Sequence, residues 1–110
     1  MSGDDSLVVK QAASEWFLYI IRTKQQHLYT GVTTDVARRF TEHQQGGVKG
    51  AKALRGKGPL QLVYQQCLAS KQQAMRLEYA IKQLPKAAKE RLVQGEIDWQ
   101  SVLPESSSKA

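Results

Sequence analysis

The stretch YTGVTTDVARRFTEH (residues 29–43) places polar side chains that could do chemistry where a predicted strand passes into a predicted helix. Tyr29 and Gly31 end the strand, and Arg39 and His43 follow in the helix. Arginine stabilises anionic oxygen, whereas histidine and tyrosine can hold or transfer protons. Because residues four apart share one helix face, Arg39 and His43 are expected to lie together. The group is therefore a candidate functional site.

Each of these residues also has a purely structural interpretation. A histidine near a helix C-terminus is favoured there as a cation, and a tyrosine in a strand usually only packs. Tyr19, in an earlier predicted strand, is open to the same two interpretations. Gly31 favours the functional one, because a glycine within a strand often marks close approach by a ligand or another backbone. Arg38 points away from the face shared by Arg39 and His43, as a solvated or backbone-contacting charge.

Glu78 is a further candidate, in the helix predicted over residues 70–84. The buried stripe of that helix consists of apolar residues at helical spacing, namely Ala74, Leu77, Ile81 and Leu84. Glu78 lies on the flank of this stripe, where an ionised carboxylate is costly without a partner. It either pairs with an arginine or holds a metal ion, and the sequence leaves both interpretations open.

The elements that position these residues follow from the apolar runs and the capping residues. Strands are predicted over residues 16–22, 27–32 and 59–67, and helices over residues 35–46, 70–84 and 85–95. A hairpin followed by a distant third strand indicates a mixed α/β fold, in which helices flank a small three-stranded antiparallel sheet. For Tyr19 and Tyr29 to serve one site, Ile21 must pair with Tyr29, because side chains alternate faces along a strand.

The distribution of charge indicates a polyanionic partner, most simply nucleic acid. The net charge is +6, and residues 16–94 contain fourteen lysine and arginine residues against four acids. Residues 46–58, called the basic loop here, combine five glycines with the cations Lys49, Lys52, Arg55 and Lys57. The glycines predict a flexible loop without a preformed surface. A surface that only keeps the protein soluble is the alternative interpretation.

Composition excludes several classes of protein. A single cysteine allows no internal disulfide, and the two histidines have no zinc-finger spacing with it. No apolar run has the length of a membrane span, and the N-terminus has no signal-peptide pattern. We expect a cytoplasmic monomer with a flexible leader at residues 1–14, one domain at residues 15–95 and a C-terminal tail at residues 96–110. No protein partner is indicated.

Together these residues resemble the GIY-YIG nuclease superfamily. The resemblance covers residues 16–94 and rests on Tyr19, the tripeptide Tyr29-Thr30-Gly31, Arg39, His43 and, in a later helix, Glu78. The segments YTGVTTDVARR and GAKALRGKGPL are similar to the small stand-alone bacterial members, the YhbQ-like group. The first tripeptide departs from the motif, because Phe17-Leu18-Tyr19 keeps the tyrosine and lacks the glycine.

The resemblance implies divalent-metal-dependent hydrolysis of DNA phosphodiester bonds, in DNA repair or processing. The implied catalytic residues are Tyr19, Tyr29, Arg39, His43 and Glu78, with Glu78 as the metal ligand. The implied substrate is single-stranded or branched DNA in preference to plain duplex, bound by Gly31, Arg38, Lys49, Lys52, Arg55, Lys57 and Lys82. The alternative is a non-catalytic basic module that binds RNA or DNA.

The small number of acids favours a single metal ion. Of the four carboxylates within residues 16–94, Asp35 and Glu42 belong to the helix predicted over residues 35–46. Glu78, waters and a substrate phosphate would then hold one Mg²⁺ or Mn²⁺. Arg39 would stabilise the charge that develops in the transition state. Tyr19 is the candidate general base, and Tyr29 would orient the water or the phosphate. His43 would assist the proton transfer or contact the phosphate.

The basic loop is expected to contribute phosphate contacts rather than base-specific ones. Replacing its four cations together by alanine (Lys49, Lys52, Arg55 and Lys57) should weaken binding to every DNA sequence alike. Each lost phosphate contact should reduce the slope of log affinity against log salt by about 0.7 to 0.9. Fluorescence anisotropy titrations at several salt concentrations measure this slope. An unchanged slope in the fourfold variant would show that the loop faces away from the nucleic acid.

Overall fold

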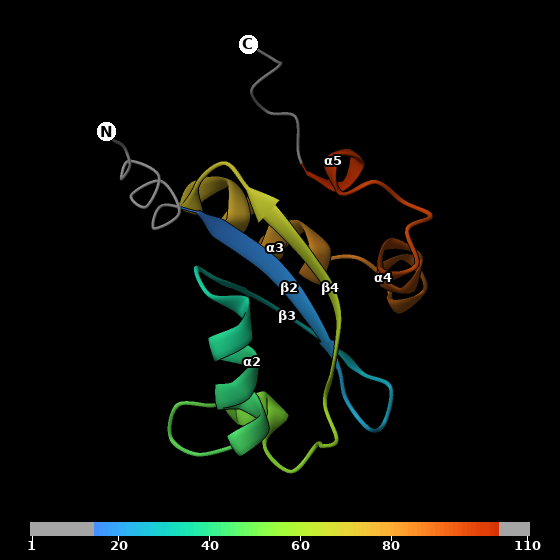
Figure 1. Cartoon of the computed structure of the whole chain (residues 1–110). Coiled ribbons are helices and arrows are strands. Elements are labelled where there is room, and N and C mark those ends of the chain that lie inside the picture. Colours follow the sequence, from blue (N-terminus) through green and yellow to red (C-terminus); the bar gives the residue numbers. More distant parts are fainter. Residues whose placement is uncertain (1–14, 104–110) are drawn as a thin grey trace, which may run out of the picture.

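The apolar run WFLYIIR forms the central strand of the sheet, where both faces are covered by helices. In the computed structural model, which describes residues 15–103, β2 (Trp16–Arg22) lies between β3 (Leu28–Thr33) and β4 (Gln61–Leu68) and is antiparallel to both (Figure 1). A strand covered on both faces is apolar almost throughout. Accordingly, the fully buried residues of β2 are Leu18, Ile20 and Ile21. The mixed α/β fold with a three-stranded antiparallel sheet is confirmed.

The pairing register of β2 and β3 is the one that a shared tyrosine site requires. Ile21 faces Tyr29 across the pair, and Tyr19 faces Gly31. Because side chains alternate between the two faces of a sheet, Tyr19 and Tyr29 emerge on the same face. Their ring centroids lie 6.4 Å apart. The register prediction is therefore confirmed.

The helix α2 (Val36–Gln45) begins and ends where the sequence predicted. The Asp35 carboxylate accepts a hydrogen bond from a main-chain N–H of the first turn at 3.0 Å. Gly46 ends the helix with a φ of 70°, a conformation that favours glycine. Val36 and Phe40 face the sheet, and this places the rest of the helix over the face from which the two tyrosines emerge.

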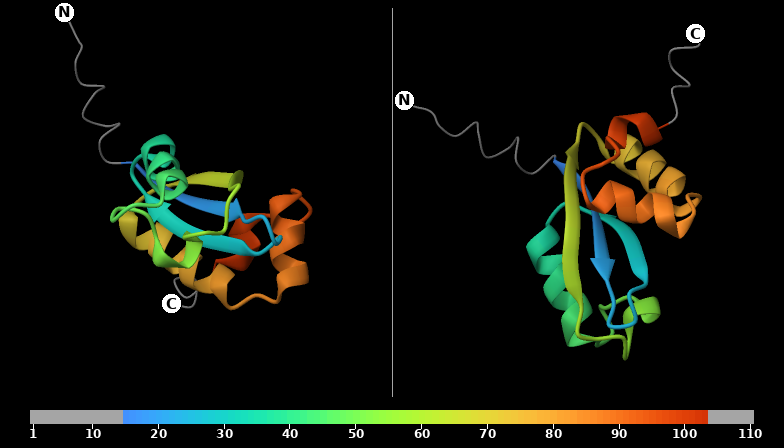
Figure 2. Two further views of the ribbon diagram at one scale, coloured as in Figure 1. Left: turned by 90° about the horizontal axis from the view of Figure 1, so that it is seen from below. Right: turned by 90° about the vertical axis from the view of Figure 1, so that its right-hand side faces the viewer.

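Three further helices cover the opposite face of the sheet. They are α3 (Lys71–Lys82), which follows the N-cap Ser70, α4 (Lys86–Val93), which follows Pro85, and the short α5 (Trp99–Val102). The views in Figure 2 show α2 on one side of the sheet and α3 and α4 on the other. No helix within residues 15–103 combines the length and the apolar composition needed to cross a membrane.

Two apolar clusters result, one on each face of the sheet. The larger cluster lies under α3 and α4 and contains Leu18, Ile20, Leu68, Ala74, Leu77, Ile81 and Leu92. The smaller cluster lies under α2 and contains Tyr19, Ile21, Val36 and Leu54. Tyr19 therefore belongs to a core and to the candidate site at once, so its hydroxyl needs a partner inside the protein.

Part of the predicted tail, up to residue 103, packs against the domain, and residues 104–110 lie outside the described residues. The tail was expected from residue 96 onward, but α5 lies within it. Three apolar residues of this segment pack against the larger cluster: Trp99, Val102 and Leu103. A helix of four residues has too little periodicity to be read from sequence. The predicted leader, residues 1–14, lies outside the described residues.

The basic loop also departs from the expectation of an irregular, flexible segment. It contains the 3₁₀ turn η1 (Lys52–Leu54), and Leu54 is buried in the smaller cluster. Gly50 of the same loop is buried as well. The glycine content indicated flexibility, whereas Leu54, together with the partly buried Ala51, anchors the loop to the core.

An ion pair with two hydrogen bonds fixes α4 to the sheet. Arg22, at the end of β2, donates from Nη1 to Glu90 Oε2 at 2.7 Å and from Nη2 to Oε1 at 2.9 Å. The Arg22 guanidinium, with help from Lys86 at 3.3 Å, lowers the pKa of Glu90 to about 2. The side chains of Arg22 and Glu90 are only 18 % and 23 % exposed, so solvent screens the pair weakly.

Glu90→Gln is expected to lower the free energy of unfolding at neutral pH by about 1.5 to 3 kcal/mol, the range for hydrogen bonds to charged groups. The pKa of Glu90 is lowered by folding, so this stabilisation is present above the unfolded value of about 4.3 and is lost as the pH falls toward about 2. Urea titrations at several pH values measure the difference from wild type.

Glu96→Gln is the control, because it removes an exposed pair with Arg91 that should contribute little. A difference between wild type and Glu90→Gln that stays constant down to strongly acidic pH would contradict the ionic character of the Arg22–Glu90 contact.

Candidate active site

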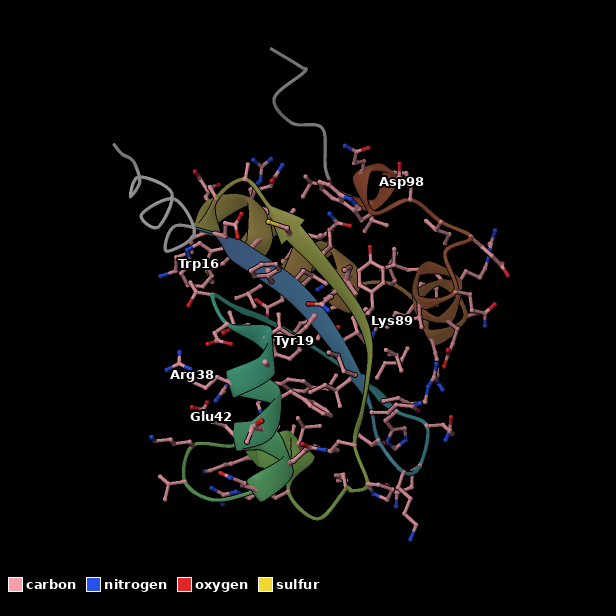
Figure 3. All side chains as sticks on the ribbon, in the orientation of Figure 1. Trp16, Tyr19, Arg38, Glu42, Lys89 and Asp98 are labelled. Carbon is pink, nitrogen blue, oxygen red and sulfur yellow. The ribbon has the colours of Figure 1, made fainter. Side chains whose placement is uncertain are left out.

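Gly31 leaves room for the ring of Tyr19 on the neighbouring strand. A Cβ atom at Gly31 would lie 2.4 Å from the Tyr19 hydroxyl oxygen and 2.6 Å from Cζ, closer than side chains pack. Tyr19 is 2 % exposed and lies between the sheet and α2 (Figure 3). The close approach that the glycine signalled is therefore made by the tyrosine, and this packing accounts for Gly31.

The hydroxyl group of Tyr19 meets His43 of α2, with its oxygen 2.9 Å from Nε2. On the other side of the imidazole, Nδ1 accepts a hydrogen bond from the main-chain N–H of Ala51 at 3.1 Å. A ring nitrogen that accepts a hydrogen bond carries no proton, so neutral His43 carries its proton on Nε2 and donates it to the Tyr19 oxygen. The sequence indicated Tyr19 and His43, but a main-chain N–H such as that of Ala51 leaves no sequence signal.

Burial favours the neutral form of both partners. Burial first, and then the neighbouring Tyr29, raise the pKa of Tyr19 to about 12, although Arg39 acts in the opposite direction. Burial and the charge of Arg39 also lower the pKa of His43. The surroundings of His43 therefore favour a neutral imidazole at neutral pH, not the helix-terminal cation of the structural interpretation.

Arg39 lies one turn before His43 on the same face of α2, as predicted. Its Nη1 donates to Glu42 Oε1 at 2.9 Å and to the main-chain carbonyl of Lys49 at 2.6 Å. The guanidinium also acts on Tyr19, because it opposes the rise of the tyrosine pKa. The three-residue spacing of Arg39 and Glu42 in the sequence predicts their contact on one helix face. No feature of the sequence predicts the contact with the Lys49 carbonyl.

Tyr29 completes the cluster from the edge strand β3. Its ring lies edge-on to the His43 ring, with centroids 5.6 Å apart, and the Tyr19 and His43 centroids are 5.9 Å apart. Tyr29 is partly exposed, unlike the buried Tyr19. The three rings therefore form one cluster, which extends from the buried Tyr19 and His43 to the partly exposed Tyr29 on the edge strand.

Glu78 approaches this cluster from α3, which packs against β2 and β3. Its carboxylate is 19 % exposed and lies 3.1 Å from Nζ of Lys82, whose side chain is 52 % exposed. The charge of Glu78 contributes to the raised pKa of Tyr19, after burial and other causes. The structure thus brings Glu78 within electrostatic reach of Tyr19, and its ion-pair partner is a lysine at the surface.

The residues of the site suit a sparsely coordinated divalent ion better than a caged one. Within residues 15–103, no three histidine, cysteine or acidic side chains are grouped so that they could hold a metal ion. Mg²⁺ commonly keeps several waters and binds through one or two carboxylates and substrate phosphates. One partly exposed carboxylate, Glu78, close to Tyr19 fits that mode of binding.

The cations predicted to bind DNA lie on the surface around this cluster. Arg38 points outward from α2 and is 66 % exposed, with its Nε 4.0 Å from Asp35 (Figure 3). In the basic loop, one cation, Lys57, is partly buried and three are exposed, namely Lys49, Lys52 and Arg55. Lys49 is thus joined to the site by its main chain while its side chain faces solvent.

A three-stranded α/β fold that joins a buried tyrosine and histidine, with an arginine beside them and a carboxylate within electrostatic reach, defines a candidate phosphodiesterase. The model of the GIY-YIG catalytic domain matches residues 15–91. The chain belongs to the GIY-YIG family, whose domain is that of a nuclease family.

Similar proteins cover most of the chain and confirm the resemblance to the YhbQ-like group. The UPF0213 protein of Cronobacter sakazakii is 58 % identical over 88 residues, which are 80 % of this chain and 90 % of the relative. UPF0213 protein YhbQ of Escherichia coli is 59 % identical over 78 residues, 71 % of this chain and 76 % of the relative. The solution NMR structure of the UPF0213 protein BH0048 from Bacillus halodurans is 46 % identical, covers 73 % of this chain and 83 % of its own, and has a TM-score of 0.48.

Gly31→Ala is expected to destabilise the protein by about 1 to 3 kcal/mol, the usual cost of overpacking a core. The added methyl group has no room unless the buried Tyr19 ring moves, and the ring is held by His43. Urea unfolding measures the loss. Gly47→Ala is the matched control, because a Cβ there meets nothing within 4 Å. Equal stability of the two variants would contradict the packing of Tyr19 over Gly31.

Proposed function

We propose that the protein is a divalent-metal-dependent endonuclease that hydrolyses phosphodiester bonds of DNA. The observation that carries the proposal is the buried hydrogen bond between Tyr19 and His43, next to Arg39. A module that only bound nucleic acid would not need a phenol hydroxyl held by a histidine of defined tautomer. Membership of the GIY-YIG family supports the same reaction.

Tyr19 is the proposed general base, and its surroundings determine how difficult that role is. With a pKa of about 12, the phenolate is disfavoured at pH 7 by about 7 kcal/mol. The Nε2–H of His43 and the charge of Arg39 both stabilise the phenolate as the proton leaves the tyrosine. A divalent ion held by Glu78 would polarise the scissile phosphate and lower the pKa of the attacking water.

Arg39 is the proposed stabiliser of charge on the phosphate. Its contacts with Glu42 and Lys49 both use Nη1, and a guanidinium has five N–H donors, so the fork can still bind a phosphate oxygen. Donors that are fixed in advance need little reorganisation as negative charge develops. Tyr29, partly exposed beside His43, would orient the water or the phosphate.

The substrate that suits this surface is single-stranded or branched DNA rather than plain duplex. Contacts from the basic loop, Arg38 and Lys82 to phosphates would bind DNA by its backbone, which favours selection by DNA structure over selection by sequence. The proposal includes one ion per site, Mg²⁺ or Mn²⁺, because Glu42 is paired with Arg39 and Glu78 is the carboxylate whose charge acts on Tyr19. Processing of branched or single-stranded DNA, as in repair, is the corresponding role.

Glu78→Gln tests the metal site. The variant keeps the shape of the side chain and removes the charge that a divalent ion requires, so cleavage of labelled oligonucleotides in Mg²⁺ should fall more than about 100-fold. Affinity for the same DNA should stay constant or rise, because a negative charge near phosphate is removed. Its stability should change by only about 0.5 kcal/mol, because Lys82 is half exposed and the pair joins residues four apart on one helix.

The cleavage assay uses single-stranded, duplex and branched DNA, with Mg²⁺, Mn²⁺ or EDTA, and thermal melts are run alongside. Glu96→Gln makes the same chemical change at an exposed pair with Arg91 and should cleave like wild type. A folded and fully active Glu78→Gln protein would refute the metal site. Binding of DNA by wild type without cleavage in any metal would favour the non-catalytic binding module instead.

A further inference from the structure

The main chain of the basic loop contacts two residues of the candidate site. The carbonyl of Lys49 accepts the 2.6 Å hydrogen bond from Arg39, and the N–H of Ala51 donates the 3.1 Å hydrogen bond to His43 Nδ1. Lys49 and Ala51 flank Gly50, which lies in a bend of the chain and donates a turn hydrogen bond to the Gly47 carbonyl at 3.0 Å. The loop therefore presents main-chain groups on both sides of Gly50 to α2.

Gly50, between these two contacts, lies directly against the backbone of α2. A Cβ atom at Gly50 would be 2.9 Å from the Glu42 carbonyl oxygen, 3.4 Å from Gly46 Cα and 3.5 Å from His43 Cα. These are main-chain atoms of a helix and its cap, which cannot move aside as the end of a flexible side chain can. The two hydrogen bonds form at these distances because residue 50 has no side chain.

We propose that the main chain of residues 49–51 is a positioning element of the nuclease site, which fixes His43 as the Nε2–H tautomer and holds Arg39, while the outward side chains of Lys49 and Lys52 bind phosphate. The inference rests on the proposed function and adds to it. The main-chain N–H of Ala51 can donate a hydrogen bond but cannot accept one. Its contact therefore requires that Nδ1 carries no proton.

This arrangement couples substrate binding to the orientation of the catalytic groups. A DNA backbone bound by Lys49 and Lys52 would hold the chain at Lys49 and directly after Ala51, the two residues whose main chain contacts Arg39 and His43. Binding free energy from phosphates remote from the scissile bond would then favour the catalytic arrangement, which is how remote contacts raise kcat. A loop that is displaced from α2 should consequently lose kcat while its lysines can still bind DNA.

Gly50→Ala, compared with Gly47→Ala, tests the proposal. Both variants add one methyl group to the same loop, but a Cβ meets the α2 backbone only at residue 50, and at residue 47 it meets nothing within 4 Å. Long-range ¹⁵N–¹H NMR of the His43 ring reports the tautomer directly. We expect a single Nε2–H tautomer in wild type and Gly47→Ala, and protonation at Nδ1 in a substantial fraction of Gly50→Ala.

In cleavage assays, kcat of Gly50→Ala should fall about 10- to 100-fold, the effect of misplacing catalytic groups by about 1 Å. DNA affinity should stay close to that of wild type in Gly50→Ala, whereas the fourfold alanine variant of the loop cations should lose affinity and keep the wild-type tautomer in the free protein. A folded Gly50→Ala protein with the wild-type tautomer and wild-type kcat would overturn the proposal. So would a wild-type His43 that carries its proton on Nδ1.

An ester analogue at Ala51, with lactic acid in place of alanine, provides a second test if Gly50→Ala does not fold. It replaces the main-chain N–H by oxygen and keeps every side chain and Gly50. Protonation should then appear at Nδ1, and an unchanged Nε2–H tautomer would overturn the proposal. The NMR result stands apart from nuclease activity, because a wild type that cleaves no DNA refutes the proposed function while the tautomer still decides the positioning role.

Discussion

The packing of Tyr19 over Gly31, with the tyrosine hydroxyl on His43, is the constraint on which the rest of the site depends. The ring occupies this place only when β2 and β3 pair in the observed register and residue 31 has no side chain. The hydroxyl reaches Nε2 only when α2 crosses the same face of the sheet, where Val36 anchors it. Strand register, glycine and helix position are therefore determined together.

The same packing creates the central electrostatic problem of the site. Burial keeps Tyr19 neutral, with a pKa of about 12, and the nearby carboxylate of Glu78 adds to this effect. The groups that face the phenol oxygen, His43 and Arg39, favour the opposite charge state. The protein thus holds a neutral phenol among groups that stabilise the phenolate. A cation at Glu78 would shift this balance, because it would cancel the charge that now opposes ionisation.

The first tripeptide can lack its glycine for a geometric reason. Phe17 lies two residues before Tyr19, so its side chain faces the same side of the sheet, and it packs with the cluster that contains Tyr19. The glycine that gives the Tyr19 ring its space is Gly31, on the neighbouring strand. The tripeptide therefore keeps the Tyr19 hydroxyl that contacts His43 and places the apolar side chain of Phe17 on the same face of the sheet.

The sequence alone determined the three strands, the boundaries of α2 and the helix face shared by Arg39 and His43, because alternation, capping and helical spacing are local properties of the chain. Only the tertiary structure decided what those side chains meet. The N–H of Ala51, the carbonyl of Lys49 and the burial that raises the pKa of Tyr19 come from segments brought together by folding. Main-chain groups are the same in almost every residue, so no sequence pattern marks them. The protonation state of the site is for that reason a property of the fold.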